Sequence, residues 1–282
     1  MEEIYIKARA KINLNLEVLG KREDNYHNIK SIFQKINLYD EIKIKKLKID
    51  KFKMITNIKE LNNEENIIYK AYKKLKEKYE QIKGIEIKLN KRIPIQAGMA
   101  GGSTDCAAFI VAMNKLFSLN LSKEKMKTLG KELGADVVPC FYNRAVIVEG
   151  IGDIVTKIDT NFKYYIVIIK PEISCNTKEM YNRLDEKEIK QKDTTKKIIK
   201  ALENHDIKIL SNNLYNVFEE VIENKEIIKE LKEELIKYGA ISSLMTGSGS
   251  AVYGIFKDKQ TAKNAYEKLK DKYNTYICTS YN

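Results

Sequence analysis

The sequence predicts an α+β protein with two domains. Strand-like and helical patterns follow one another in mixed order along the 282 residues, and such an order is typical of the α+β class. A chain of this length buries a substantial core and suffices for two ordinary domains. The stretch DTNFK at 159–163 precedes a buried strand pattern, so we expect one domain at residues 1–160 and a second at 161–282.

The first hundred residues begin with strands and then include a helix. Alternating polar and apolar residues predict strands in EIYIKA, KINLNLEVLG, SIFQKINLYDEIKIKKL and DKFKMITNI. Residues 64–80 instead place one apolar stripe on a helix, formed by Ile67, Ile68, Ala71, Tyr72 and Leu75. Strand alternation returns at 84–93.

A glycine cluster separates that strand from the most apolar helix of the chain. The segment STDCAAFIVAMNKLFSLN is apolar on most helical faces and should be central, with Ser103, Thr104 and Asp105 as caps of its first turn. A second helix is expected at 122–134, between an N-capping Ser122 and Gly134. AVIVEGIGDIVTKI then predicts a strand, a turn and a strand.

The C-terminal part repeats the mixture of elements. YYIVIIKP predicts a buried strand, and residues 176–238 are mostly helical, with the charge runs of 183–200 as solvated helix faces. ISSLMTG and AVYGIF predict strands, KQTAKNAYEKLKDKY a helix and YICTS a last strand.

Composition indicates a cytoplasmic globular protein. No run of about 18 apolar residues is present, and the acidic, alternating N-terminus is typical of a strand rather than of a signal peptide. The four cysteines are widely spaced without a CxxC pair, which favours free thiols in a reducing compartment. The net charge of +12 comes almost entirely from lysines scattered along the chain, with only five arginines. This pattern favours a lysine-rich surface over a nucleic-acid-binding stripe.

The stretch KRIPIQAGMAGGSTDCAA carries the strongest functional pattern. Gly98, Gly101 and Gly102 fall within five positions at the mouth of the apolar helix, although the whole chain has only 13 glycines. Close backbone approach and unpaired N–H groups at a helix N-terminus make an anion site, and phosphate is the usual anion. No lysine follows Gly102 as a Walker-type loop requires, and the spacing is not that of a dinucleotide-binding G-x-G-x-x-G. A tight strand-to-helix turn without a ligand is the alternative.

PIQAGMAGGSTDCAA resembles the phosphate-binding motif of the GHMP kinases, the family of galactokinase and the homoserine, mevalonate and phosphomevalonate kinases. AKINLNLEVLGKREDNYHNIKSIFQKINLYDEI and LGADVVPCF are similar to the members that act on 4-diphosphocytidyl-2-C-methyl-D-erythritol, and MTGSGSAVYGIF to the third glycine motif of the family. The segments occur in the expected order over nearly the whole chain.

Three positions depart from the pattern of that family. Asn25 stands where the turn usually has Gly, and asparagine tolerates a left-handed conformation there. Ala100 also replaces a usual Gly, so we expect negative φ at this position or a slightly widened loop. In DVVP, one more residue than usual separates Asp136 from Pro139.

The resemblance implies a ribosomal-S5-like N-terminal domain, a ferredoxin-like C-terminal domain and an active site in the cleft between them. It implies ATP-dependent phosphorylation of the 2-hydroxyl of 4-diphosphocytidyl-2-C-methyl-D-erythritol, in the non-mevalonate route to isoprenoid precursors, with Mg²⁺ as the metal. The expected partner is a small-molecule substrate, with no nucleic acid and no membrane. The expected oligomeric state is a monomer or weak homodimer. The sequence names no protein ligand for the metal.

The resemblance also assigns roles to residues. Asp136 is the general base, and Lys11 lies beside it as a cation that stabilises developing charge. Asn66 matches the adenine contact of the family, although it is equally suited to be the N-cap of its helix. The ATP phosphates are assigned to a continuous loop: Pro94, Ile95, Gln96, Ala97, Gly98, Met99, Ala100, Gly101, Gly102, Ser103 and Thr104.

For the second substrate, the turn NYH supplies an aromatic ring and an imidazole, Tyr26 and His27, which suit stacking on a base and hydrogen bonding to its edge. By resemblance this turn holds cytosine together with Thr177 and Tyr181, and Asn13 lies near the erythritol hydroxyls. One alternative is a GHMP kinase for homoserine or mevalonate, which the NYH turn disfavours because those substrates contain no base. A second alternative is a nucleic-acid-binding protein.

Overall fold

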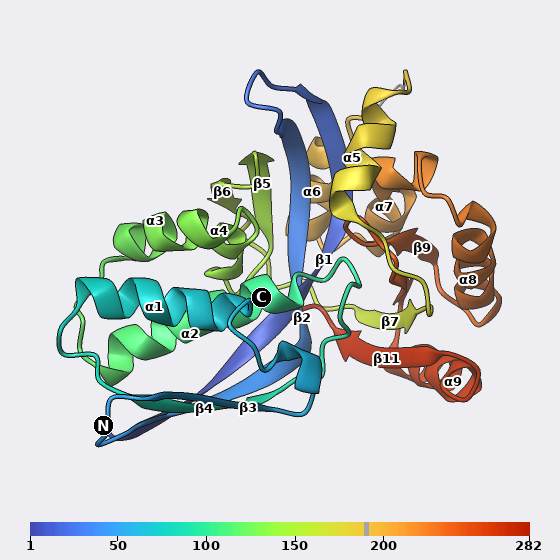
Figure 1. Cartoon of the computed structure of the whole chain (residues 1–282). Coiled ribbons are helices and arrows are strands. Elements are labelled where there is room, and N and C mark those ends of the chain that lie inside the picture. The colour runs from blue at the N-terminus through green and yellow to red at the C-terminus, as the bar shows by residue number, and fades with distance from the viewer. Residues whose placement is uncertain (189–191) are drawn as a thin grey trace. The chain divides into compact units, whose positions relative to one another are not determined.

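The computed structural model describes residues 1–188 and 192–282 (Figure 1). These residues form two compact units. The first unit comprises Met1–Ala10, Tyr39–Ile93 and Ala100–Phe141, and the second comprises Lys11–Leu38, Pro94–Met99 and Tyr142–Asn282. The chain therefore enters each unit more than once, and the predicted domain boundary after residue 160 stays a prediction.

Two long strands contribute residues to both units. They are β1 (Glu3–Lys21) and β2 (His27–Lys46). The predicted strands EIYIKA and KINLNLEVLG are thus one strand, a correction to the sequence analysis, because Ala8, Ala10, Ile12 and Leu14 continue one buried row without a turn between them. The turn from β1 to β2 is closed by a hydrogen bond from Asn25 N to Arg22 O, and Asn25 adopts φ 63°, the expected left-handed conformation.

In the first unit, the end of β2 pairs antiparallel with β4 (Ile85–Asn90), and β4 pairs parallel with β3 (Phe52–Thr56). The helices of this unit are α1 (Ile67–Lys78), α2 (Gly101–Leu116), α3 (Lys123–Leu133) and the short α4 (Val137–Cys140), besides the 3₁₀ turn η1 (Lys59–Leu61). Side chains of α1, α2 and the strands form one apolar core, in which α2 is the central helix (Figure 1). Its predicted apolar character and position are confirmed.

In the second unit, β2 pairs antiparallel with β5 (Val146–Gly150), β5 pairs with β6 (Ile154–Lys157), and β1 pairs in parallel with the short β8 (Tyr215–Asn216). A separate antiparallel sheet has the order β11-β7-β10-β9. Its strands are β7 (Tyr165–Lys170), β9 (Ser242–Met245), β10 (Val252–Phe256) and β11 (Asn274–Thr279).

Helices α8 (Lys225–Lys237) and α9 (Lys259–Leu269) pack on that sheet (Figure 1). The remaining elements of the second unit are α5 (Thr177–Asp185), α6 (Thr195–Glu203), α7 (Ile207–Asn212) and the 3₁₀ turn η2 (Val217–Glu220). The four predicted C-terminal elements and the helical character of 176–238 are confirmed; the part of the charge run at 189–191 lies outside the described residues.

Helix ends follow local chemistry in most places. Ser122 caps α3 by accepting a hydrogen bond from Lys125 N at 3.2 Å, and Gly134 is the C-cap, as predicted. The caps expected for α2 are wrong: its N-cap is Ala100, without a side-chain capping bond. The reason is that Thr104 and Asp105 are already helical and use their side chains elsewhere.

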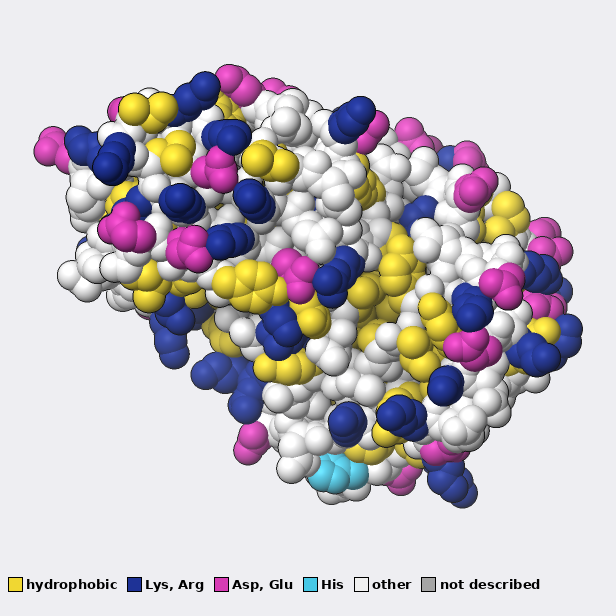
Figure 2. Space-filling model, turned by 90° about the horizontal axis from the view of Figure 1, so that it is seen from below, with side chains coloured by type: hydrophobic (Ala, Val, Ile, Leu, Met, Phe, Trp, Pro, Cys, Tyr) yellow, Lys and Arg dark blue, Asp and Glu magenta, His cyan; other side chains and the backbone are white. Residues whose placement is uncertain are grey.

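The surface carries mixed charge. Figure 2 shows one face on which lysine, arginine, aspartate and glutamate side chains are interspersed with apolar ones. Within the described ranges, no helix has the length and apolar character that a membrane span requires.

Candidate active site

The first half of the glycine loop is packed in the second unit against the turn after β9. An added Cβ on Gly98 would lie 1.9 Å from Thr246 O, and one on Gly247 would lie 2.7 Å from Gly98 O. Gly98 and Gly247 have φ 69° and 57°, which favours glycine at both positions. The two glycine motifs therefore need their glycines partly for close backbone contact with each other.

Lys11 is buried beside this contact. Its ammonium donates to Asn13 Oδ1 at 2.6 Å and to Gly98 O at 2.8 Å, and it lies 4.5 Å from the ring centre of Phe33. Asn13 in turn is held by Ser31 and by Thr246, whose hydroxyl also contacts Gly98 O at 3.3 Å. The structure thus brings together Lys11, Asn13 and the loop, whereas Asp136 belongs to the other unit and its pairing with Lys11 stays a prediction.

The second half of the loop begins α2 in the first unit. Ala100 has φ 55°, so the expectation of a negative φ is wrong. It is the N-cap in a left-handed conformation, and α2 begins at the next residue, Gly101. Gly102 is exposed, and an added Cβ would meet no atom nearer than Ile67 Cγ2 at 4.0 Å. The first N–H groups of a helix have no intrahelical acceptor, so the open space at Gly102 suits a phosphate.

Thr104 is less suited to that role. It is buried; its N–H donates to Ala100 O, and its hydroxyl donates to Arg9 O at 2.6 Å. Both of its donors are engaged within the protein. Ser103, half-buried beside Gly102, has the more suitable hydroxyl for a phosphate.

Asp136 occupies the N-cap position of α4, yet its side chain makes no capping hydrogen bond. It is half-buried between Gly134 and the fully buried Val137 and Val138. The carboxylate of Asp136 lies at the start of an apolar helical turn but does not cap it, so it is available for chemistry.

Asn66 is the N-cap of α1. Its Oδ1 accepts from Ile68 N at 2.9 Å and its Nδ2 donates to Leu61 O at 2.9 Å. The capping alternative is therefore realised. A contact of Asn66 with adenine stays a prediction.

The predicted base-binding residues form a cluster in the second unit. His27 stacks on Tyr181 with ring centres 4.6 Å apart and planes at 17°, and Phe218 meets the Tyr181 ring edge-on. His27 Nε2 lies 2.6 Å from Asp185 Oδ1, and Lys21 binds the other oxygen of Asp185 at 2.8 Å. Hydrogen bonds from Lys21 and His27 lower the pKa of Asp185 below its usual range. Tyr26, 58% exposed, is the ring left open for stacking.

Thr177, the first residue of α5, completes the set of predicted residues. Its hydroxyl lies 2.8 Å from Ser248 Oγ, so the base cluster and the third glycine motif are joined in one unit. Sequence reasoning missed Asp185, Thr246 and Ser248. Asp185 follows Tyr181 by one helical turn, which is the one pattern that relates it to the predicted site.

Comparison with known proteins gives the family. The model of the GHMP kinases N terminal domain matches residues 66–144, and that of the GHMP kinases C terminal matches 198–275. Proteins named 4-diphosphocytidyl-2-C-methyl-D-erythritol kinase from Clostridioides difficile and Alkaliphilus oremlandii are 42% and 40% identical to this chain. The matches cover 99% and 100% of this chain and 96% and 98% of the relatives. The chain belongs to the GHMP kinases.

Solved structures of GHMP kinases agree. The crystal structure of a 4-(cytidine 5'-diphospho)-2C-methyl-D-erythritol kinase is similar with a TM-score of 0.86 and 26% identity, covering 99% of this chain and 100% of that one. Homoserine kinase from Cytophaga hutchinsonii has a TM-score of 0.75 at 17% identity, a likeness of fold alone. The predicted α+β GHMP kinase fold is confirmed.

Proposed function

We propose that this GHMP kinase transfers the γ-phosphoryl group of ATP to the 2-hydroxyl of 4-diphosphocytidyl-2-C-methyl-D-erythritol, a step of isoprenoid precursor synthesis. The observation that carries the choice of substrate is the cluster of Tyr26, His27, Tyr181 and Asp185. An open aromatic ring beside an oriented imidazole suits a nucleobase, and neither homoserine nor mevalonate contains one. The names of the relatives support the same choice.

ATP fits the open N-terminus of α2. The phosphates would lie at Gly101, Gly102 and Ser103, where the first N–H groups of the helix have no intrahelical acceptor and an added Cβ on Gly102 would meet open space. Among the residues that the structure describes, no group of three or more His, Cys, Asp or Glu side chains could hold a metal ion. Mg²⁺ takes few protein ligands beside phosphate oxygens and water, so it would be held chiefly by the ATP phosphates and would neutralise their charge.

Asp136 would take the proton of the 2-hydroxyl as that oxygen attacks the γ-phosphorus and the bond to the ADP oxygen breaks. Lys11 would add positive charge, and its contacts with Asn13 and Gly98 O fix the position of its ammonium. A cytoplasmic location belongs to the same proposal and agrees with the four free cysteines.

An assay of ADP release tests the proposal. The purified chain is given ATP and Mg²⁺ with the cytidine diphosphate substrate, homoserine or mevalonate, each over the same concentration range. We expect ADP release with the first substrate alone. Equal or faster release with homoserine or mevalonate would overturn the choice of substrate while leaving kinase activity in place.

A further inference from the structure

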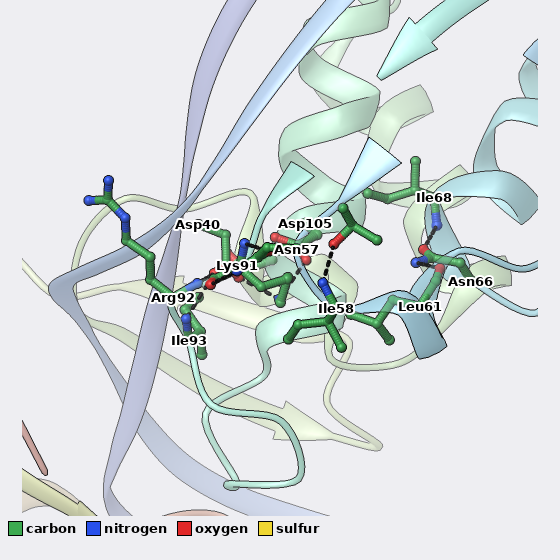
Figure 3. A network of polar contacts seen from close by, with 12 residues as sticks. Asp40, Asn57, Ile58, Leu61, Asn66, Ile68, Lys91, Arg92, Ile93 and Asp105 are labelled. Atoms are coloured by element: carbon green, nitrogen blue, oxygen red, sulfur yellow. Dashed lines mark hydrogen bonds and ion pairs between the residues drawn. The ribbon is translucent and has the colours of Figure 1, made fainter. Parts of the chain in front are cut away.

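The most deeply buried ion-pair cluster of the first unit is centred on Lys91, which the proposed mechanism does not use. The Lys91 ammonium lies 2.5 Å from Asp40 Oδ2 and 2.7 Å from Asp105 Oδ2 (Figure 3). The side chains of Lys91, Asp40 and Asp105 are only 4%, 0% and 4% exposed. Taking three charges out of water costs more than an apolar core of the same shape, so stability alone does not explain the cluster.

The cluster is also not fully satisfied. One ammonium faces two carboxyl groups, and Asp105 Oδ1 is buried without a hydrogen-bond partner. Burial raises the pKa of Asp105 well above its usual range even though Lys91 opposes that shift. Because one acceptor is left unsatisfied, the cluster is better explained by the chain segments that it positions than by a contribution to the free energy of unfolding.

Asp40 on β2 fixes the chain just before the glycine loop. Its Oδ1 accepts from the backbone N–H groups of Arg92 and Ile93 at 2.5 and 2.8 Å, while Oδ2 binds Lys91. One buried carboxylate thus sets the direction in which the chain leaves β4.

The ammonium of Lys91 lies directly behind the start of α2. An added Cβ on Gly101 would be 3.3 Å from Lys91 Nζ and 3.2 Å from Ile93 Cγ2. The space that glycine leaves at Gly101 is filled by the protein interior, whereas the space at Gly102 is open. Gly101 therefore permits contact with Lys91, and Asp105 one turn later makes the ion pair that holds this turn.

The backbone of Lys91 is joined to a different segment. Lys91 N donates to Asn57 Oδ1 at 2.8 Å, and Asn57 Nδ2 donates to Lys91 O at 3.0 Å. Asn57 begins the stretch that runs through η1 to Asn66, whose Nδ2 binds Leu61 O (Figure 3). Lys91 thus contacts the start of α2 with its side chain and the segment 57–66 with its backbone.

We propose that Lys91, together with Asp40 and Asp105, is a positioning residue that holds the first turn of α2 and the segment 57–66 in the mutual arrangement that ATP requires. The inference rests on the proposed binding of ATP at the start of α2 and does not place Lys91 in contact with ATP. Loss of the ammonium would leave Asp40 and Asp105 buried without the donor that joins them, so the first turn of α2 would no longer be tied to β2 and β4.

The test compares ATP affinity with stability. The Kd of ATP is measured by calorimetry, and the KM of the phosphoryl acceptor and the unfolding midpoint are measured beside it. Lys91→Met should raise the Kd of ATP at least about tenfold, which corresponds to about 1.4 kcal/mol. The acceptor KM should stay within about twofold, because the acceptor residues Tyr26, His27 and Tyr181 are not part of this cluster. Lys74→Met removes the exposed pair with Glu132 in the same unit and should change neither constant.

Two further variants separate positioning from folding. Asp105→Asn keeps the shape of the side chain, so it should raise the Kd of ATP about threefold or more without lowering the unfolding midpoint. This variant tests the inference even where Lys91→Met does not fold. Adding Asp105→Asn to Lys91→Met replaces one of the two buried carboxyl groups that have lost their donor by an amide that can donate, so the midpoint should recover while ATP affinity does not. Recovery of both together, or wild-type affinity in folded single variants, would overturn the inference. A wild-type chain that binds no ATP would instead overturn the proposed function on which it rests.

Discussion

His27 Nε2 lies 2.6 Å from Asp185 Oδ1, and the same imidazole stacks on Tyr181. Because hydrogen bonds from Lys21 and His27 lower the pKa of Asp185, the carboxylate is ionised near neutral pH and can only accept. The hydrogen on Nε2 therefore points at Asp185, and the position of the second ring nitrogen is fixed with it. Asp185 thereby sets the tautomer and the orientation of an imidazole that we propose to meet the cytosine.

Replacing Asp185 should therefore affect only the cytidine substrate. Asp185→Ala should raise the KM of that substrate about tenfold, and Asp185→Asn should raise it less, because the amide oxygen still accepts from Nε2. The ATP KM should stay nearly constant in both variants. Lys21→Met is the matched control, since it removes the other partner of Asp185 and leaves His27 bound. An equal rise in both KM values would indicate general damage and contradict the assignment.

Two glycines of the loop should respond to substitution in opposite ways. Gly102→Val enters open space, so its unfolding midpoint should stay close to wild type while the Kd of ATP rises at least about tenfold. Gly98→Ala places a methyl group 1.9 Å from Thr246 O at φ 69°, so it should lose more than about 2 kcal/mol of unfolding free energy. Thermal unfolding and calorimetry measure the two effects; a folded Gly102→Val with wild-type ATP affinity would count against a phosphate there.

Patterns local in sequence were predictable, and contacts between distant residues were not. The stripe of α1 and the Ser122 cap follow from spacings of three and four residues, and both are confirmed. Lys91 lies 51 residues from Asp40 and 14 from Asp105, spacings that no helix or strand period relates. The sequence predicts a capping role for Asp105, because a carboxylate early in a helix is usually a cap. The buried ammonium beside it is visible only in three dimensions.

Burial of Asp105 predicts a pH dependence of stability. Its pKa is raised in the folded state above the unfolded value of about 3.9, so the folded chain binds more protons between these two pKa values. Stability from this group is therefore greatest below pH of about 4 and falls as pH rises toward the folded pKa. Asn does not titrate, so the midpoint of Asp105→Asn minus that of wild type should grow as pH rises from about 4 toward the folded-state pKa of Asp105. Thermal unfolding across this range checks the sign, and a constant difference would show that Asp105 does not titrate on unfolding.

Asp136 should matter for turnover and little for folding. Its side chain caps nothing, so Asp136→Asn removes a charge without removing a structural hydrogen bond. A general base acts only as the hydroxyl attacks, and its loss therefore appears in kcat rather than in KM. General-base catalysis typically supplies about 10²–10⁴-fold, and we expect a loss of that size with both KM values little changed.

Asp206 offers the opposite case in the same chain. It is the N-cap of α7, and its Oδ1 accepts from Lys208 N and Ile209 N, each at 2.9 Å. Asp206→Ala should cost about 1 kcal/mol of unfolding free energy and leave kcat unchanged. Steady-state kinetics and thermal unfolding of the two variants should therefore give crossed results: lost turnover with retained stability at Asp136, and lost stability with retained turnover at Asp206. Near-normal kcat in a folded Asp136→Asn would remove Asp136 as the base, while the ATP-binding and cytidine-binding assignments, which depend on other residues, would stand.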